Sequence, residues 1–178
     1  MGWDRRLFVI LACSLIVPTS AFATPPAGVV SNVIVAQGVA SRPVNEHIDI
    51  GGTWAVRLED KGDSEFYFQD LVIGPGGYTG WHSHPGLLLI TVKDGSVDFY
   101  GKDCAKHTYA SGQSFTESAE SHTAMNRGSG NARLLVAYIL KKGEPRRIEA
   151  PQPACGAAAR DPVIADSYFT APAVSPDT

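Results

Sequence analysis

Short runs rich in β-branched and aromatic residues recur along the middle of the chain, and they constrain the fold more than any other feature. Strands favour such residues, and partial alternation of polar and apolar positions is typical of half-buried strands. No segment shows a sustained helical period. The sequence therefore predicts an all-β domain, either a small barrel or a sandwich. The runs are VVSNVIVAQ, TWAVRLED, EFYFQDLVI, LLLITVK, SVDFY, HTYASGQSF and ARLLVAYIL.

Two turn signals separate these runs. Asp94-Gly95 lies between LLLITVK and SVDFY, and this dipeptide predicts a two-residue hairpin. The segment NRGSGN, residues 126–131, predicts a second tight turn. The run GLLLITV is apolar on both faces, so one face can line a barrel while the other needs cover. Either the N-terminal strands of the same chain or a second subunit could cover it, so a homodimer is one of two open expectations.

The N-terminus differs from the middle of the chain. Residues 1–23 combine the basic pair Arg5-Arg6, an apolar run and the small-residue pattern Ala21-Phe22-Ala23, which is typical of an export signal cleaved near Ala23. The apolar run is too short for a membrane span, so the mature protein is expected to have none. The stretch DRRLFV is similar to a twin-arginine export pattern. We therefore expect a periplasmic or secreted protein.

The C-terminus is rich in proline and alanine. We expect a single β-barrel domain over residues 24–141, followed by an extended tail over residues 142–178. Cys104 and Cys155 would survive signal cleavage, and such a pair in an oxidising compartment predicts a disulfide that pins the tail to the barrel. The formal net charge of −3 indicates no nucleic-acid partner.

Three histidines have a spacing that suggests one metal site. His82 and His84 would lie on one face of a regular strand, where two imidazoles can reach the same ion at roughly 2 Å. His122 is the candidate third ligand from another strand. His47 and His107 are expected at the surface instead, because one lies in a polar segment and the other beside a turn.

These residues resemble the motifs of the cupin superfamily. Gly76, five residues, His82-Ser83-His84 and a gap to Gly95 resemble the first cupin motif, and His122, three residues and Asn126 resemble the end of the second. The resemblance covers residues 70–140, and the chain also resembles small exported single-domain cupins of bacteria. It implies a double-stranded β-helix (a jelly-roll barrel) that is often dimeric and holds a divalent metal in the barrel mouth.

The chain also departs from the family pattern. Leu88 occupies the position of the family's glutamate, and Glu117 and Ala119 replace a proline and a glycine of the second motif. We therefore expect a three-histidine site for Fe, Mn, Zn, Cu or Ni without a carboxylate. Such a site leaves the charge of a 2+ ion uncompensated and should favour a small anionic ligand. Two alternatives stay open, a barrel that has lost its metal and a site that uses Glu117 or Glu120 as a fourth ligand.

Two functions fit this pattern. The first is an exported metal-dependent enzyme, an oxygenase or isomerase acting on a small anionic organic molecule. The second is a non-catalytic module that binds a small ligand with or without metal, because the residues beside the histidines offer few groups to move a proton. Four residues are candidates for lining the pocket or supporting the ligands: Trp81, Leu88, Tyr100 and Asn126.

Overall fold

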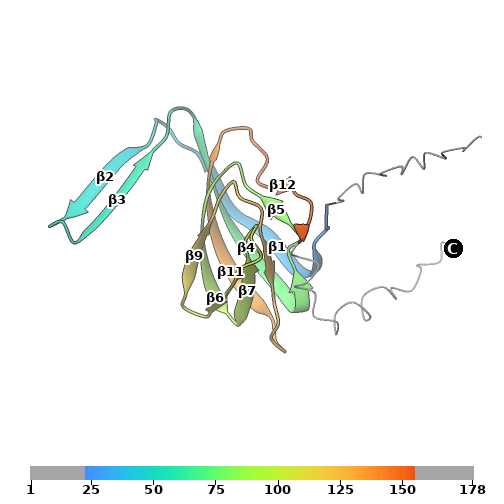
Figure 1. The fold of residues 1–178 in the computed structure, drawn as a ribbon. Helices are drawn as coiled ribbons and strands as arrows, with labels where there is room; N and C mark the ends of the chain where they lie inside the picture. Colours follow the sequence, from blue (N-terminus) through green and yellow to red (C-terminus); the bar gives the residue numbers. More distant parts are fainter. Residues whose placement is uncertain (1–22, 155–178) are drawn as a thin grey trace, which may run out of the picture.

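Residues 23–154 are described by a computed structural model, in which eight strands form one antiparallel sheet that curls into a nearly closed barrel (Figure 1). Seven of them are hydrogen-bonded in the order β8-β7-β10-β4-β11-β6-β9, and β1 also pairs with β4. The predicted all-β jelly-roll barrel is therefore confirmed. The strands are β1 (Ala27–Val39), β2 (Asn45–Ile50), β3 (Trp54–Glu59), β4 (Ser64–Tyr78), β5 (His82–Ser83), β6 (Gly86–Asp94), β7 (Ser96–Tyr100), β8 (Lys106–Ala110), β9 (Ser114–Glu117), β10 (Thr123–Met125), β11 (Ala132–Lys141) and β12 (Ile148–Glu149).

The turn at Asp94-Gly95 is present, but the hairpin predicted there is wrong. Strand β6 pairs with β11 and β9, whereas β7 pairs with β10 and β8, so the two strands that flank Gly95 do not pair with each other. Gly95 has φ of 74°, and a Cβ there would lie 2.6 Å from the carbonyl oxygen of Asn131. The glycine therefore turns a corner of the barrel where the chain passes from one set of strands to the other.

The core lies inside the barrel and follows strict alternation. In β6 the side chains of Leu88, Ile90 and Val92 are buried, while Leu89 and Thr91 between them point outward. Strand β11 alternates in the same way, with five buried side chains that belong to the same core as those of β6. Burial of each such aliphatic side chain stabilises the fold by about 1.5–3 kcal/mol. The buried residues of β11 are Ala132, Leu134, Val136, Tyr138 and Leu140.

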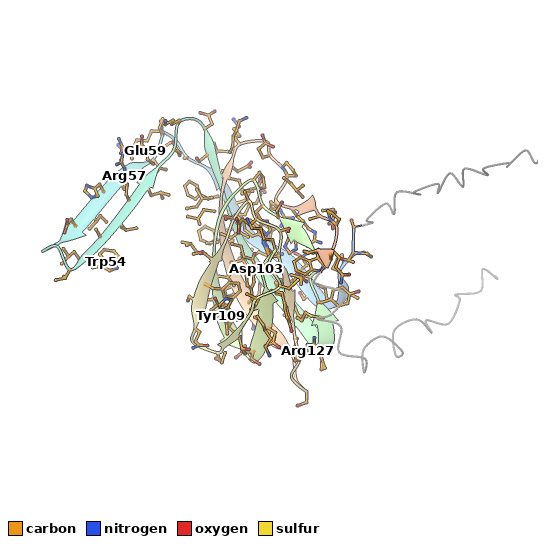
Figure 2. All side chains as sticks on the ribbon, in the orientation of Figure 1. Trp54, Arg57, Glu59, Asp103, Tyr109 and Arg127 are labelled. Carbon is orange, nitrogen blue, oxygen red and sulfur yellow. The ribbon has the colours of Figure 1, made fainter. Side chains whose placement is uncertain are left out.

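Two segments lie outside this barrel sheet. Strands β2 and β3 form a two-stranded hairpin, which we call the arm, and Figure 2 shows its residues Trp54, Arg57 and Glu59 well away from the barrel. The segment 142–151 runs back to the barrel mouth, where β12 pairs with β5 and the amide of Ala150 donates to the carbonyl of Trp81. This return segment brings the beginning of the predicted tail beside the histidines.

Candidate metal centre

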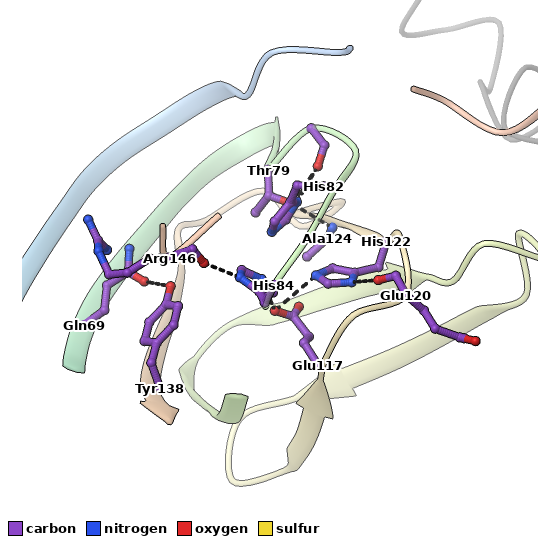
Figure 3. A network of polar contacts seen from close by, with 11 residues as sticks. Gln69, Thr79, His82, His84, Glu117, Glu120, His122, Ala124, Tyr138 and Arg146 are labelled. Carbon is purple, nitrogen blue, oxygen red and sulfur yellow. Dashed lines mark hydrogen bonds and ion pairs between the residues drawn. The ribbon is translucent and has the colours of Figure 1, made fainter. Parts of the chain in front are cut away.

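Four side chains converge in the barrel mouth. His82, His84, His122 and Glu117 each direct one ligand atom to a common point, and these atoms all lie within 4.8 Å of one another (Figure 3). The backbones of His82 and His122 hold each other through reciprocal amide-to-carbonyl hydrogen bonds of 3.0 and 2.8 Å. The three histidines singled out from their spacing are thus brought together, although they come from separate short segments.

Each imidazole is oriented by a backbone carbonyl. The Nδ1 atom of His82 lies 2.8 Å from the carbonyl oxygen of Gly80. The Nδ1 atom of His84 lies 2.5 Å from the carbonyl oxygen of Arg146, and that of His122 lies 2.7 Å from the carbonyl oxygen of Glu120. Because a carbonyl only accepts hydrogen bonds, Nδ1 carries the proton in each ring. The Nε2 atom is then left with a free lone pair, the form in which imidazole binds metals.

Glu117 supplies the carboxylate that the sequence lacked at Leu88. Glu117 on β9 pairs directly with Leu88 on β6, and residues directly opposite in an antiparallel ladder point to the same face of the sheet. The carboxylate therefore reaches the cluster from the neighbouring strand. This arrangement corrects the expectation of a site without a carboxylate. It agrees with the alternative that Glu117 is the fourth ligand.

Glu120 is not the fourth member of this cluster. Its side chain is 66% exposed and forms an ion pair with Lys102. The sequence placed it on the face of His122 by assuming a regular strand, but β9 ends at Glu117 and β10 begins only at Thr123. The irregular segment between them turns the Glu120 side chain outward and uses only its carbonyl, which accepts from His122.

Burial and mutual charge set the protonation of the cluster. Burial raises the pKa of Glu117, but its interactions with His122 and His84 outweigh this and lower the pKa below its usual value. Burial lowers the pKa of His122, and the carboxylate of Glu117 outweighs that effect and raises it. The pKa of His82 falls to about 3, because of burial first and the neighbouring His122 second. Glu117 is therefore ionised and His82 neutral near pH 7.

These donors fit a bound cation. Nε2 of His84 and Nε2 of His122 lie 3.2 and 3.3 Å from the same oxygen of Glu117, yet both nitrogens are buried without an aligned hydrogen bond. With Nδ1 protonated, these nitrogens direct lone pairs at a carboxylate oxygen, which is unfavourable unless a positive charge lies between them. A divalent ion bound by three nitrogens and one oxygen would satisfy every one of these groups.

A cavity of about 370 Å³ adjoins the cluster and includes His82, His84 and Glu117 in its lining. Arg146 lines it from the return segment, with its guanidinium 5.6 and 5.9 Å from the ring centroids of Tyr67 and Tyr138. Sequence reasoning missed the polar lining of this cavity, which comes from strands remote in the chain and from the Arg146-Arg147 pair. The polar residues beyond the cluster are Asn32, Gln69, Thr79, Tyr138, Arg146 and Arg147.

The four residues expected to line the pocket or to support the ligands lie in the barrel wall. Trp81 and Tyr100 are buried, and Leu88 is fully buried in the hydrophobic core beneath the cluster. Asn126 is 1% exposed, and its side chain bonds to the backbones of Ile73, Gly128 and Gly130. None of the four lines the cavity beside the metal cluster. They support the barrel wall around the site.

The other sequence expectations have separate outcomes. His47 on β2 and His107 on β8 are exposed, as expected. Cys155 and residues 1–22 lie outside the described residues, so the disulfide with Cys104 and the export signal stay predictions. Within residues 23–154 no helix is long and apolar enough to cross a membrane.

Comparisons with known proteins give one family match. Residues 70–138 match the family model described as Cupin domain. None of the curated proteins matches this chain in sequence.

Several solved structures are similar to the chain. The polyketide cyclase RemF from Streptomyces resistomycificus is 19% identical, with a TM-score of 0.43 over 52% of this chain and 68% of that chain. A structure of the DMSP lyases RdDddP and RnDddQII is 23% identical, with a TM-score of 0.42 over 48% of this chain and 44% of that chain. An uncharacterised protein with a double-stranded β-helix domain from Klebsiella pneumoniae is 18% identical, with a TM-score of 0.43 over 62% of this chain and 85% of that chain.

The family match runs from within β4 to within β11, and this part of the chain contains all four residues of the cluster. It coincides with the region in which His82, His84 and His122 have the spacing of the cupin motifs. Residues 70–138 of this chain form a cupin domain.

Proposed function

We propose that this protein binds a divalent first-row metal through His82, His84, His122 and Glu117, and a small organic anion in the adjoining cavity. The convergence of three oriented imidazoles and one buried carboxylate carries this proposal. A bound divalent ion would act as a Lewis acid that polarises an oxygen of the ligand. The export pattern of residues 1–23 supports a periplasmic or secreted location.

The preference for an anion rests on Arg146 rather than on an uncompensated metal. Glu117 would reduce the net charge of a 2+ centre to +1, which weakens the argument made from three histidines alone. Arg146 restores the preference, because no carboxylate within residues 23–154 forms an ion pair with its guanidinium. Arg147, by contrast, is paired with Glu149. A guanidinium without an acidic partner beside a cationic centre is suited to hold a carboxylate.

An oxygenase or isomerase of a small anion is the enzymatic form of this function. A second form, binding without catalysis, is favoured by the state of the cavity's acid–base groups. Burial first and Glu117 second raise the pKa of Tyr138 to about 12, so its hydroxyl donates a hydrogen bond, here to Gln69, rather than accepting a proton. Turnover of small carboxylates by the metal-loaded protein would distinguish the two forms.

Metal analysis tests the proposal directly. We expect the purified protein to carry close to one equivalent of a divalent transition metal. Alanine at His82, His84 or His122 should remove most of it, because each change deletes one ligand of a four-ligand centre. Alanine at the exposed His47 or His107 is the matched control and should leave metal content unchanged. Loss of metal in the His107→Ala protein, or metal-free wild type after incubation with divalent ions, would contradict the assignment.

Arg146 is tested through ligand affinity rather than metal content. We expect Arg146→Gln to keep its metal but to bind malonate at least about tenfold more weakly, since a charge-assisted hydrogen bond contributes about 1.5–3 kcal/mol. Malonamide, which is neutral and similar in shape, should bind equally to both proteins. The measurement is calorimetric titration of metal-loaded protein, with Arg57→Gln on the arm as the control. Equal malonate affinity in wild type and Arg146→Gln would show that Arg146 does not select the anion.

A further inference from the structure

The lining of the cavity beside the metal cluster changes with distance from the cluster. Strands β6, β11 and β4 are neighbours in the barrel sheet, and their paired inward side chains form successive rows across it. The first row contains Glu117, Leu88 and Tyr138, because Leu88 pairs with both of the others. Rows on one face follow each other every two residues, which is about 7 Å along a strand. The second and third rows therefore lie about 7 and 14 Å from the row of the carboxylate.

The charged side chains of the lining gather at the cluster end of the cavity. Glu117 lies in the first row with Tyr138, which pairs with Tyr67 on β4. The guanidinium of Arg146 lies 5.6 and 5.9 Å from the ring centroids of Tyr67 and Tyr138, so it belongs to the same end (Figure 3). Arg147 follows Arg146 on the return segment and is paired with Glu149. An anion therefore has its attractive partners at one end only.

The next two rows bring no charged side chain of the described residues to the cavity. The second row contributes Ile90, Val136 and Gln69, because Val136 pairs with both of the others. The third row contributes the paired residues Leu134 and Leu71. Ile90, Leu134 and Val136 are between 2% and 5% exposed, so this part of the cavity lies inside the barrel. Its wall is aliphatic apart from Gln69.

Gln69 uses both ends of its amide within the protein. Its Oε1 accepts from the hydroxyl of Tyr138, and its Nε2 donates to Oδ1 of Asn32 (Figure 3). An ionised group placed in the second or third row would meet no opposite charge there and would lose its water, which is strongly unfavourable. A hydrocarbon group would instead be taken out of water against aliphatic side chains, which is favourable.

We propose that the cavity selects an amphipathic monocarboxylate, with its carboxylate between the metal centre and Arg146 and its hydrocarbon body against Ile90, Val136 and Leu134. The cavity of about 370 Å³ has room for on the order of ten non-hydrogen atoms at about 30 Å³ each, so a body of several carbons fits. A dicarboxylate long enough to reach the second row would place its second charge on the aliphatic wall. This inference rests on the proposed function and adds the class of ligand to it.

The test measures affinity against chain length by calorimetric titration of the metal-loaded protein. Acetate, butyrate and hexanoate should bind with affinity that rises about fourfold for each buried methylene, which is at least about tenfold from butyrate to hexanoate. The heat-capacity change of binding should become more negative along the series. Adipate has the length of hexanoate and a carboxylate at each end. It should bind at least about tenfold more weakly than hexanoate, because its second charge would be buried.

A single substitution tests where the hydrocarbon body lies. Val136→Thr keeps the shape of the side chain but adds a hydroxyl to the second row, and hexanoate would strip water from that hydroxyl. We expect hexanoate to bind at least about fivefold more weakly, with acetate unchanged, because acetate does not reach the second row. Val97→Thr is the matched control, because Val97 is 1% exposed in the same core but does not line the cavity. Equal metal content and circular dichroism would show that all three proteins are folded.

The outcomes separate this inference from the proposed function. If acetate binds and hexanoate binds no better, or if adipate binds as tightly as hexanoate, the amphipathic ligand is wrong and the anion site stands. If no carboxylate binds to the metal-loaded protein, the anion site itself is wrong and this inference falls with it. Unchanged hexanoate affinity in the Val136→Thr protein would place the hydrocarbon body elsewhere and overturn the inference. The chain-length series needs no substitution, so it decides the question even where a threonine variant does not fold.

Discussion

Replacing Glu117 with leucine is expected to abolish most metal binding, and adding glutamate at position 88 is expected to restore it. Leu88 and Glu117 are directly opposite on β6 and β9 and share the inner face of the barrel. Exchanging the two side chains across the ladder keeps one carboxylate and one leucine beside the histidines. Loss of a neighbouring support residue costs a metal site 10–100-fold, so loss of this ligand should cost at least about 100-fold in affinity. We expect the exchanged protein to recover to within about tenfold of wild type.

The measurement is competition with a metal chelator for wild type, Glu117→Leu and the double variant Leu88→Glu with Glu117→Leu. Glu120→Gln serves as the control, because Glu120 is exposed and paired with Lys102 outside the cluster. If Glu117→Leu binds metal as tightly as wild type does, the three histidines suffice and Glu117 is no ligand. If the double variant binds no better than Glu117→Leu does, position 88 cannot reach the ion.

Alanine at Asn126 is expected to produce the largest loss of stability among single changes outside the core. The Nδ2 group of Asn126 donates at 2.8 Å to the carbonyls of both Ile73 and Gly130, and its Oδ1 accepts at 2.9 Å from the amide of Gly128. The residue is 1% exposed, so deleting its amide leaves the buried carbonyl of Ile73 without this donor, at about 1–3 kcal/mol, and also removes the two bonds that hold the exposed turn at Gly128 and Gly130. We expect a loss of about 3 kcal/mol and a fall in Tm of about 10 °C.

Denaturation should be followed in excess chelator, so that bound metal does not add to the stability of either protein. Asn131→Ala provides the comparison, because Asn131 lies in the same turn but is exposed. It should change the free energy of unfolding by less than about 0.5 kcal/mol. Metal affinity in the Asn126→Ala protein should stay near that of wild type at temperatures where it is folded. A small stability effect with a large loss of metal would instead give Asn126 a direct role at the site.

The histidine cluster could be predicted from the sequence, because motif spacing is a local property. The carboxylate that completes it could not. Only Ser83 separates His82 from His84 in the sequence, and the resemblance to the cupin motifs linked them with His122. Glu117 joins them only because β9 pairs with β6 in one particular register. A shift of that register by one residue would turn the carboxylate to the outer face. The sequence offered Glu117 and Glu120 as alternatives, and its only ground for choosing, the position of Glu120 two residues from His122 in an assumed regular strand, pointed to the wrong one.

The hairpin predicted at Asp94-Gly95 illustrates a second limit. The dipeptide correctly indicated where the chain turns, since Gly95 adopts a positive φ. Turn chemistry acts over four residues and does not specify which strands pair afterwards. In the barrel, β6 pairs with β11 and β9, so pairing between strands far apart in the sequence determines where the chain runs after the turn.

The β content, the inward faces of the long strands and the three histidines could be predicted without the structure, because alternation and motif spacing are properties of neighbouring residues. Three features could be seen only in the folded chain: Glu117 completes the cluster, Arg146 lines the cavity beside it, and the arm leaves the outer face of the barrel uncovered. Each of these depends on contacts between segments far apart in the chain. Such contacts are set by strand register and by the hydrogen bonds of the return segment, which no local pattern encodes.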